Sequence, residues 1–353
     1  MCGAGGHSVS DTGPEGSVRS ADLGGGAGRE PVRVAVDAMG SDRGARAVIQ
    51  GAQQAAADGV QPVIFGSEGL DTGGLALVPT TQVVGMDEKP ADAFRTKEDS
   101  SLVRAVKAVA DGEADALVSP GSTGAMLAAG LVLLRRVPGV RRPAIAVPIP
   151  SRRGPSILID AGANADCRAE HLLQFATMGA VFAEEILGVA QPRVRLLSIG
   201  EEPEKGNQLV LEAHRLLAAS DLRFLGNVES RELLEGGTDV VVADGFTGNV
   251  ALKAVEGTIR TLLDSFRTEI AATPRGKLGG LLIRPAARRL RTRLDPDTYG
   301  GAYLLGLRGL AVIAHGNSSR TAIANAVRLA ARGVDHDVVG RLAASLPQRT
   351  EVV

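Results

Sequence analysis

The sequence predicts an α/β fold in which a mostly parallel sheet is sandwiched by helices. Three observations lead to this fold class. Short runs of β-branched and apolar residues recur along the chain, each run ends in Gly, Asp or Ser, and an Ala- and Leu-rich stretch of helical length follows it. Strands that alternate with helices in this way usually pair in parallel and carry the helices on their faces.

The predicted strands are apolar on both faces, which is typical of strands buried in a parallel sheet. They span residues 32–36, 63–65, 116–118, 157–159, 194–199, 240–243 and 310–314. The predicted helices span residues 43–57, 100–111, 125–135, 169–187, 207–218, 249–270 and 318–331. We divide the chain into a Gly-rich disordered extension (1–30), one α/β domain (31–334) and a C-terminal tail (335–353) that includes a short helix.

Composition excludes several classes of function. The chain has 39 basic and 40 acidic side chains and no Trp, so neither a global field nor base stacking favours nucleic-acid binding. Two cysteines exclude a disulfide framework, and no apolar run is long enough to span a membrane. The first 30 residues lack the pattern of a secretory signal, so we expect a cytoplasmic protein. Metal-ligand spacing and the dinucleotide fingerprint are both missing, so we expect neither a metal nor another cofactor.

Polar, glycine-bearing segments follow the predicted strands. They lie at residues 37–42, 119–125, 160–167, 199–207, 226–229, 244–253 and 315–319. Ligands of open parallel sheets bind where the strands end and the helices begin, because backbone N–H groups are unpaired there and the helix dipole favours anions. We therefore expect these segments to converge on one edge of the sheet.

The segment SPGSTGA is the first candidate for an anion site. Ser119, Gly121, Ser122, Thr123 and Gly124 lie between a strand and a helix, where their N–H groups and hydroxyls can cradle a phosphate. The alternative is a serine N-cap with glycines that allow close packing.

Two further segments carry candidate catalytic groups. Lys205 and Asn207 lie at a helix start, where a lysine is misplaced in the helix dipole unless an anion binds beside it. The alternative is a solvated lysine. Asp244 follows a strand, and Asn249 and Lys253 lie one turn apart on one helix face, where they can polarise a carbonyl or hold a phosphate oxygen. The alternative is Asn249 as the N-cap of this helix, with a structural Asp244–Lys253 pair.

Three more residues have both a functional and a structural interpretation. Lys97, in RTKEDSS, either contacts phosphate or is a surface charge beside a helix cap. His315 is a candidate for contact with the reacting group or a hydrogen-bonded structural histidine. Cys167, at a helix start, has the position of a nucleophile, but a small packed side chain is the favoured interpretation.

Residues 273–294 interrupt the α/β pattern with seven basic residues and no acidic one. We interpret this segment as a protruding basic amphipathic helical hairpin. Its candidate membrane-binding residues are Leu281, Leu282, Ile283, Arg288 and Arg289. Docking of an acidic partner, together with arginines at 135–142, and a merely solvated hairpin are the alternatives.

Ten motifs in order resemble the phosphate acyltransferase family of bacterial phospholipid synthesis, the PlsX type. They read DAMGSD, RTKEDSS, VSPGSTGA, RRPAIAVPIPS, LIDAGANADC, QFATMGAVFA, IGEEPEKGN, LGNVESREL, DGFTGNVALK, and YGGAYLLGLRG with HGNSS, and they cover residues 32 to about 331. Ser122 replaces the usual Asn, and Ser41 replaces a usual Gly. Both substitutes are small and can form hydrogen bonds.

The resemblance implies transfer of a fatty acyl group from acyl carrier protein to inorganic phosphate. It also implies a fold like that of phosphate acetyltransferases and the isopropylmalate dehydrogenase group, a homodimer, and substrate binding by Asp37, Gly40 and Asn164. The product would pass to a membrane glycerol-3-phosphate acyltransferase, which implies transient contact with the inner face of the cell membrane.

On this basis we expect Lys205, Asn207 and the 119–124 turn to hold phosphate, Asn249 or Lys253 to meet the oxyanion, and Asp244 to orient a lysine or manage a proton. Phosphate attacks directly, without an acyl-enzyme. The rivals are a phosphotransacylase that uses coenzyme A thioesters, a non-catalytic membrane scaffold, and a decarboxylating dehydrogenase, which the missing carboxylate cluster disfavours.

Overall fold

The computed structural model describes residues 30–346, apart from the side chains of Ala91 and Pro296, so the predicted extension at 1–30 lies almost entirely outside it. The strands are β1 (Arg33–Asp37), β2 (Gln61–Gly66), β3 (Ala76–Pro79), β4 (Ala116–Ser119), β5 (Ala144–Ile149), β6 (Ser156–Ile159), β7 (Val194–Ser198), β8 (Phe224–Glu229), β9 (Val240–Val242), β10 (Ala302–Leu305) and β11 (Leu310–Ile313). The helices are α1 (Ala45–Ala56), α2 (Pro90–Thr96), α3 (Ser101–Ala110), α4 (Thr123–Ala129), α5 (Ala169–Leu187), α6 (Gln208–Ala218), α7 (Gly245–Ala271), α8 (Pro274–Leu294), α9 (Arg320–Asp335) and α10 (Val338–Ser345).

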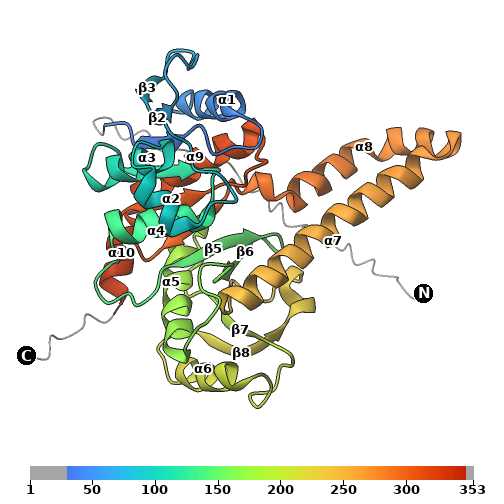
Figure 1. The fold of residues 1–353 in the computed structure, drawn as a ribbon. Coiled ribbons are helices and arrows are strands. Elements are labelled where there is room, and N and C mark those ends of the chain that lie inside the picture. The colour runs from blue at the N-terminus through green and yellow to red at the C-terminus, as the bar shows by residue number, and fades with distance from the viewer. Residues whose placement is uncertain (1–29, 347–353) are drawn as a thin grey trace, which may run out of the picture. The chain divides into compact units, whose positions relative to one another are not determined.

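Figure 1 shows the fold. All the strands described belong to one sheet, in the order β3-β2-β1-β4-β11-β10-β5-β6-β9-β7-β8. Pairing is parallel from β3 to β11 and again from β6 to β8. Between these halves, β10 is antiparallel to both β11 and β5, and β5 is antiparallel to β6. The two parallel halves therefore run in opposite directions. The prediction that all strand exits share one edge is wrong for this reason.

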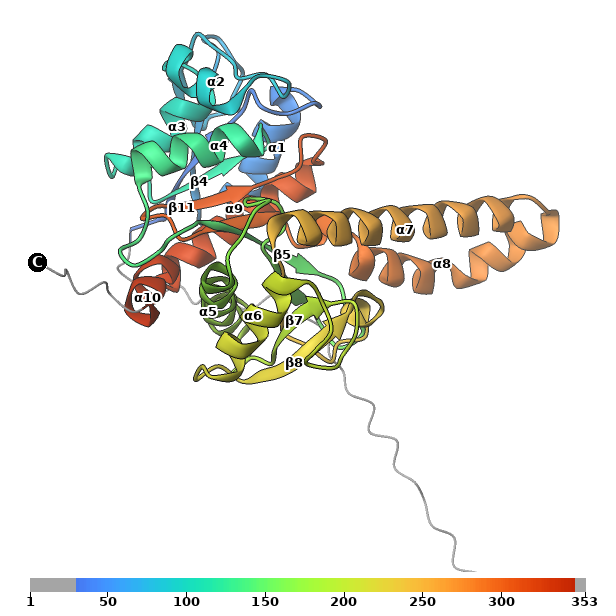
Figure 2. The ribbon, with the colours of Figure 1, turned by 60° about the horizontal axis from the view of Figure 1, so that its bottom comes forward.

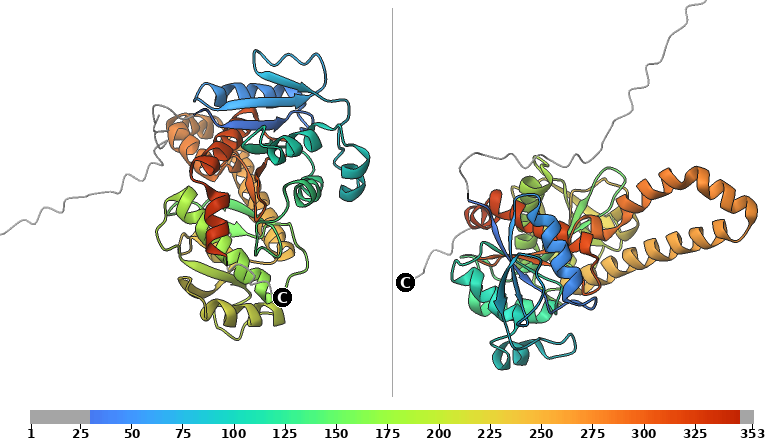
Figure 3. Two further views of the ribbon diagram at one scale, coloured as in Figure 1. Left: turned by 90° about the vertical axis from the view of Figure 1, so that its left-hand side faces the viewer. Right: turned by 90° about the horizontal axis from the view of Figure 1, so that it is seen from above.

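Two apolar cores lie on the two faces of the sheet. In β1, Val34 and Val36 face the core formed with α1, α5 and α9, whereas Ala35 faces the core formed with α3, α4 and the start of α7. This alternation follows from the two-residue side-chain period of a strand. Figure 3 shows the resulting arrangement of helices around the sheet.

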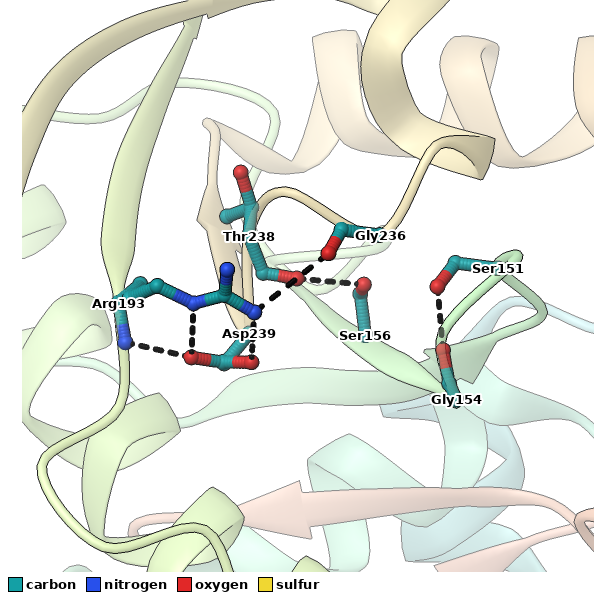
Figure 4. A network of polar contacts seen from close by, with 7 residues as sticks. All are labelled: Ser151, Gly154, Ser156, Arg193, Gly236, Thr238 and Asp239. Atoms are coloured by element: carbon teal, nitrogen blue, oxygen red, sulfur yellow. Dashed lines mark hydrogen bonds and ion pairs between the residues drawn. The ribbon is translucent and has the colours of Figure 1, made fainter. Parts of the chain in front are cut away.

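Paired Arg and Asp side chains join the starting ends of parallel strands in both halves of the sheet. Before β7, Arg193 donates to Asp239, which precedes β9, with Nε and Nη2 each 2.9 Å from a carboxylate oxygen (Figure 4). At the first residue of β1, Arg33 donates from Nη2 to Asp115, which precedes β4, at 2.8 Å. Burial alone would raise the pKa of Asp239, but the hydrogen bonds from the Arg193 side chain and backbone outweigh it and hold the pKa below its ordinary value.

A helical hairpin extends from the rest of the domain (Figure 2). Its two arms are α7, which begins at the sheet, and α8, so residues 273–294 form one arm rather than the whole hairpin. The Thr273 hydroxyl caps α8 by accepting a hydrogen bond from Gly276 N at 2.9 Å. No side chain described for α8 is buried, and Leu278, Leu281 and Leu282 are each more than 60% exposed. Within residues 30–346 no helix is both long and apolar enough to cross a membrane.

The predicted strands and helices are all present, most with ends shifted by one to four residues. The helix predicted at 125–135 is α-helical to Ala129 and is followed by a π-helical turn at Gly130–Leu134. The sequence pattern missed β3, β5, β8 and β10. Residues 226–229, expected to follow a strand, lie within β8. The C-terminal tail forms α10, whose Val338 and Leu342 are buried.

Candidate active site

A central cavity of about 420 Å³ lies between the two halves of the sheet. Gly121, Ser122 and Thr123, which follow β4, and His315, which follows β11, line it from one half. Gly162, which follows β6, and three α7 side chains, Asn249, Lys253 and Glu256, line it from the other. Six of the residues predicted from the sequence therefore share one cavity: Gly121, Ser122, Thr123, Asn249, Lys253 and His315.

Sheet twist explains how exits from oppositely directed halves reach one cavity. Adjacent strands rotate by about 20–25°, so the five steps from β4 to β9 accumulate on the order of 100°. The exits of β4 and β11 and those of β6 and β9 are turned toward each other as a result.

Residues from two other segments, the end of β1 with the loop after it and the start of α3, hold the 119–124 turn in place. Asp37 is 1% exposed, and its two carboxylate oxygens accept hydrogen bonds from Ser101 and Ser119, each at 2.6 Å. Ser119 Oγ in turn accepts from Gly121 N at 3.0 Å. A Cβ at Gly40 would lie 2.6 Å from Gly121 Cα, so only glycine fits at that contact. Asp37, Gly40 and Ser119 therefore hold the turn in position but do not themselves line the cavity.

The start of α7 is fixed against the exit of β6. The Asp244 carboxylate caps α7 by accepting hydrogen bonds from Thr247 N at 2.9 Å and Thr247 Oγ1 at 2.7 Å. Gly248 allows the helix to contact the backbone of Asp160, because a Cβ there would lie 2.0 Å from the Asp160 carbonyl oxygen. Asp244 is thus a helix cap and does not pair with Lys253, in contrast to both sequence-based interpretations of its role.

Asp160 organises the loop that follows β6. It is fully buried and accepts hydrogen bonds from the N–H groups of Ile145, Ala163 and Asn164 at 2.8–3.0 Å and from Asn164 Nδ2 at 2.8 Å. Burial raises its pKa, against the lowering effect of these donors. Asn164 also donates to Pro143 O at 2.7 Å and is buried, so it shapes this loop and does not line the cavity.

Glu256 was not selected from the sequence, yet it lies between two predicted residues. Its carboxylate is 2.9 Å from Lys253 Nζ and 3.6 Å from His315 Nε2. The side chain of Glu256 is 15% exposed, compared with 55% for Lys253 and 47% for His315. Its position seven residues after Asn249, on the same helix face, was the signal available in the sequence.

Three further predicted residues, Lys97, Lys205 and Asn207, also lie away from the central cavity. Lys205 is exposed, and Asn207 caps α6 and lines a different groove. Their strand, β7, is six strand steps from β4, on the order of 29 Å across the sheet. Lys97 donates to Val83 O at 2.7 Å and forms an ion pair with Glu88, and its hydrogen bond lowers the pKa of that carboxyl. The structure thus brings neither Lys205 nor Asn207 to the 119–124 turn.

Cys167 is half-buried and has its Sγ 3.6 Å from Asn164 O. Burial raises the pKa of its thiol to about 11. The group is therefore a thiol at neutral pH, which favours the interpretation of a packed side chain over that of a nucleophile.

A second depression, the α7 groove, has a volume of about 920 Å³ and lies on the opposite face of α7. Val250, Ala254 and Thr258 of α7 line it together with Leu233 and Asn207. Val255 borders both the α7 groove and the central cavity. The groove is mainly apolar, and Val250 at its wall is 55% exposed.

Sequence comparisons identify the family of the chain. The family model described as "Fatty acid synthesis protein" matches residues 32–341. The phosphate acyltransferase of Heliobacterium modesticaldum is 42% identical over 334 residues, covering 91% of this chain and 100% of that protein. The chain belongs to the phosphate acyltransferase family. The phosphate acyltransferase of Moorella thermoacetica, 43% identical over 330 residues, covers 91% of this chain and 97% of its own length.

Solved structures agree with the fold of this acyltransferase. A branched-chain phosphotransacylase from Enterococcus faecalis superposes with a TM-score of 0.58, at 17% identity over 86% of this chain and 99% of that one. The EutD phosphotransacetylase from Staphylococcus aureus superposes with a TM-score of 0.56, at 18% identity over 86% and 94% of the two chains. The predicted phosphate acetyltransferase-like α/β fold is confirmed.

Proposed function

We propose that this phosphate acyltransferase moves a fatty acyl group from acyl carrier protein to inorganic phosphate. The observation that carries the proposal is the meeting of the glycine-rich 121–123 turn with Asn249 and Lys253 in one cavity. The turn provides N–H and hydroxyl donors for an anion, and α7 provides an amide and an ammonium on the facing wall.

The chemistry needs little more than this arrangement. A phosphate oxygen attacks the thioester carbonyl carbon, the C–S bond breaks, and the phosphate proton ends on the departing thiolate. The products are acyl phosphate and free thiol. Positioning phosphate beside the carbonyl and supplying donors to the oxyanion lower the barrier. We assign phosphate to the 121–123 turn and Lys253, and the oxyanion to Asn249.

Phosphate-dependent release of thiol from palmitoyl acyl carrier protein tests the reaction, with palmitoyl coenzyme A run in parallel and acyl phosphate followed by ³¹P NMR. We expect strong release from the carrier protein and a new acyl phosphate signal. Preference for coenzyme A would instead indicate a phosphotransacylase. Lipid binding without turnover of either thioester would indicate a non-catalytic scaffold.

We also propose that α8 contacts an anionic membrane surface, where a labile acyl phosphate passes to a membrane glycerol-3-phosphate acyltransferase. Leu281 and Leu282, 64% and 79% exposed, and the exposed Arg288 and Arg289 support this role. The arginines at 135, 136, 141 and 142 are exposed and suit an acidic carrier protein better, because they lie on the loop before β5 and not on the hairpin.

A homodimer is the assembly that we propose, with the α7 groove as its interface. Phe246 and Val250 of α7 and Ile199 after β7 are 67%, 55% and 81% exposed. Apolar side chains gathered at a wide groove favour a protein–protein contact, and an isologous pair would bury the same face on both copies.

A further inference from the structure

We infer that Glu256 is a positioning residue that holds Lys253 and His315 toward a phosphate group in the central cavity. The inference rests on the proposed function, and it adds the group that keeps the two donors in place. Glu256 touches both side chains, and all three residues line the cavity.

Lys253 needs such a partner because its side chain is flexible and more than half exposed. An unpaired lysine at this position would lose considerable rotamer entropy on binding an anion. Glu256 lies three residues further along α7, is largely covered, and accepts one of the three hydrogens of the ammonium at 2.9 Å. Two hydrogens of Nζ remain for a ligand.

The same carboxylate connects the two halves of the sheet. Lys253 and Glu256 belong to α7, which follows β9, whereas His315 belongs to the loop after β11. Glu256 Oε1 is 3.6 Å from His315 Nε2 while Oε2 holds Lys253. One carboxylate therefore accepts a hydrogen bond from Lys253 on one wall and lies within ion-pair distance of His315 on the other.

Glu256→Gln tests this inference, and the chain offers a closely matched control. Glu185 on α5 also bridges a cation and a histidine, with Arg341 at 3.2 Å, His336 at 3.6 Å and 17% side-chain exposure, but it does not line the central cavity. We expect Glu256→Gln to lower kcat/KM for phosphate by about 10- to 100-fold through a raised phosphate KM, with the KM for the acyl thioester within about 2-fold. Glu185→Gln should stay within about 2-fold of wild type in both constants, since surface-site changes are usually small.

A double-mutant comparison separates positioning from general structural support. In a Lys253→Ala background, Glu256→Gln should lower kcat/KM for phosphate by less than about 3-fold, because the ammonium that Glu256 holds is already absent. An equal loss in both backgrounds would overturn the inference. So would a lowered phosphate KM in Glu256→Gln, which would mean that the carboxylate only repels the anion.

Calorimetric titration with inorganic phosphate measures phosphate binding directly, so it tests the role of Glu256 without relying on turnover. Glu256→Gln should weaken phosphate binding at least 10-fold, because a displacement of the donors by about 1 Å is enough to cause a loss of this size. A wild type that binds phosphate but releases no thiol would refute the proposed function alone. An active wild type whose Glu256→Gln variant binds phosphate normally would refute the positioning role alone.

Discussion

Lys253 and Lys205 were both predicted from their positions near helix starts, and only Lys253 lines the central cavity. Lys253→Ala should lower kcat/KM for phosphate by about 10²-fold, because it removes the ammonium that we assign to binding and positioning phosphate. Lys205→Ala, at an exposed site outside the cavity, should leave turnover and the phosphate KM within about 2-fold. Steady-state kinetics of the two variants test this prediction. A larger loss of kcat/KM for phosphate in Lys205→Ala than in Lys253→Ala would place the phosphate site at the loop after β7.

Cys167 provides a separate test of direct attack by phosphate. Because burial raises the pKa of its thiol to about 11, we expect Cys167→Ser to keep kcat within about 3-fold of wild type. Intact-protein mass spectrometry of wild type quenched during turnover should show no added acyl mass. An acyl adduct that disappears in Cys167→Ser would instead establish a covalent intermediate.

At the scale of secondary structure, the Arg193–Asp239 pair joins the starts of β7 and β9. The folded-state pKa of Asp239 lies below its unfolded value. Its contribution to the free energy of unfolding is therefore fully present above about pH 4, the ordinary pKa of an aspartate, and is lost as the pH falls through the lower folded-state pKa. Asp239→Asn should lower the free energy of unfolding by about 1–3 kcal/mol at pH 7, the usual contribution of a charge-assisted pair.

Urea unfolding from pH 7 to pH 3 checks this expectation. Wild type should lose stability more steeply than Asp239→Asn as the solution is acidified. Asp221→Asn, at an exposed position, is the control and should follow wild type. Parallel curves for wild type and Asp239→Asn would contradict the role of the pair.

The second element-scale prediction concerns α8. Charge reversal in the double variant Arg288→Glu, Arg289→Glu should abolish flotation with vesicles that contain anionic lipid, because each basic residue near such a surface contributes about 1 kcal/mol. Turnover of soluble acyl carrier protein thioester should stay within about 2-fold, since neither arginine lines the central cavity. Arg141→Glu should leave flotation intact. Equal flotation of wild type, the double variant and Arg141→Glu would contradict the proposed membrane contact of α8.

For the whole molecule, the prediction concerns assembly. Val250→Glu places a carboxylate at the α7 groove, and a dimer that buries this face should dissociate because the charge would be desolvated. Light scattering should then give a mass near one 36.3 kDa chain. Leu282→Glu on α8, where the native side chain is 79% exposed, should leave the mass of the assembly unchanged. A dimeric Val250→Glu would place the interface elsewhere.

The sequence by itself determined the α/β class, the approximate positions of most helices and strands, and six of the residues that line the central cavity. Periodicity and glycine-bearing strand exits report local backbone preferences, and these were enough to identify Gly121, Asn249 and Lys253 as neighbours of strand ends. The pattern missed β5 and β10, whose pairing with each other joins residues far apart in the chain, such as Ala146 and Tyr303, and a local pattern does not record such a contact.

Only the tertiary structure decided which strand exits meet. The antiparallel strands in the middle reverse the second half of the sheet, and accumulated twist then turns the exits of β4 and β9 toward one cavity while β7 stays far from it. For this reason Lys205, which was predicted to hold phosphate, lies outside the central cavity, whereas Glu256, which was not predicted, lines it. A carboxylate that bridges residues 253 and 315 is a contact across two parts of the chain, and no local pattern in the sequence encodes it.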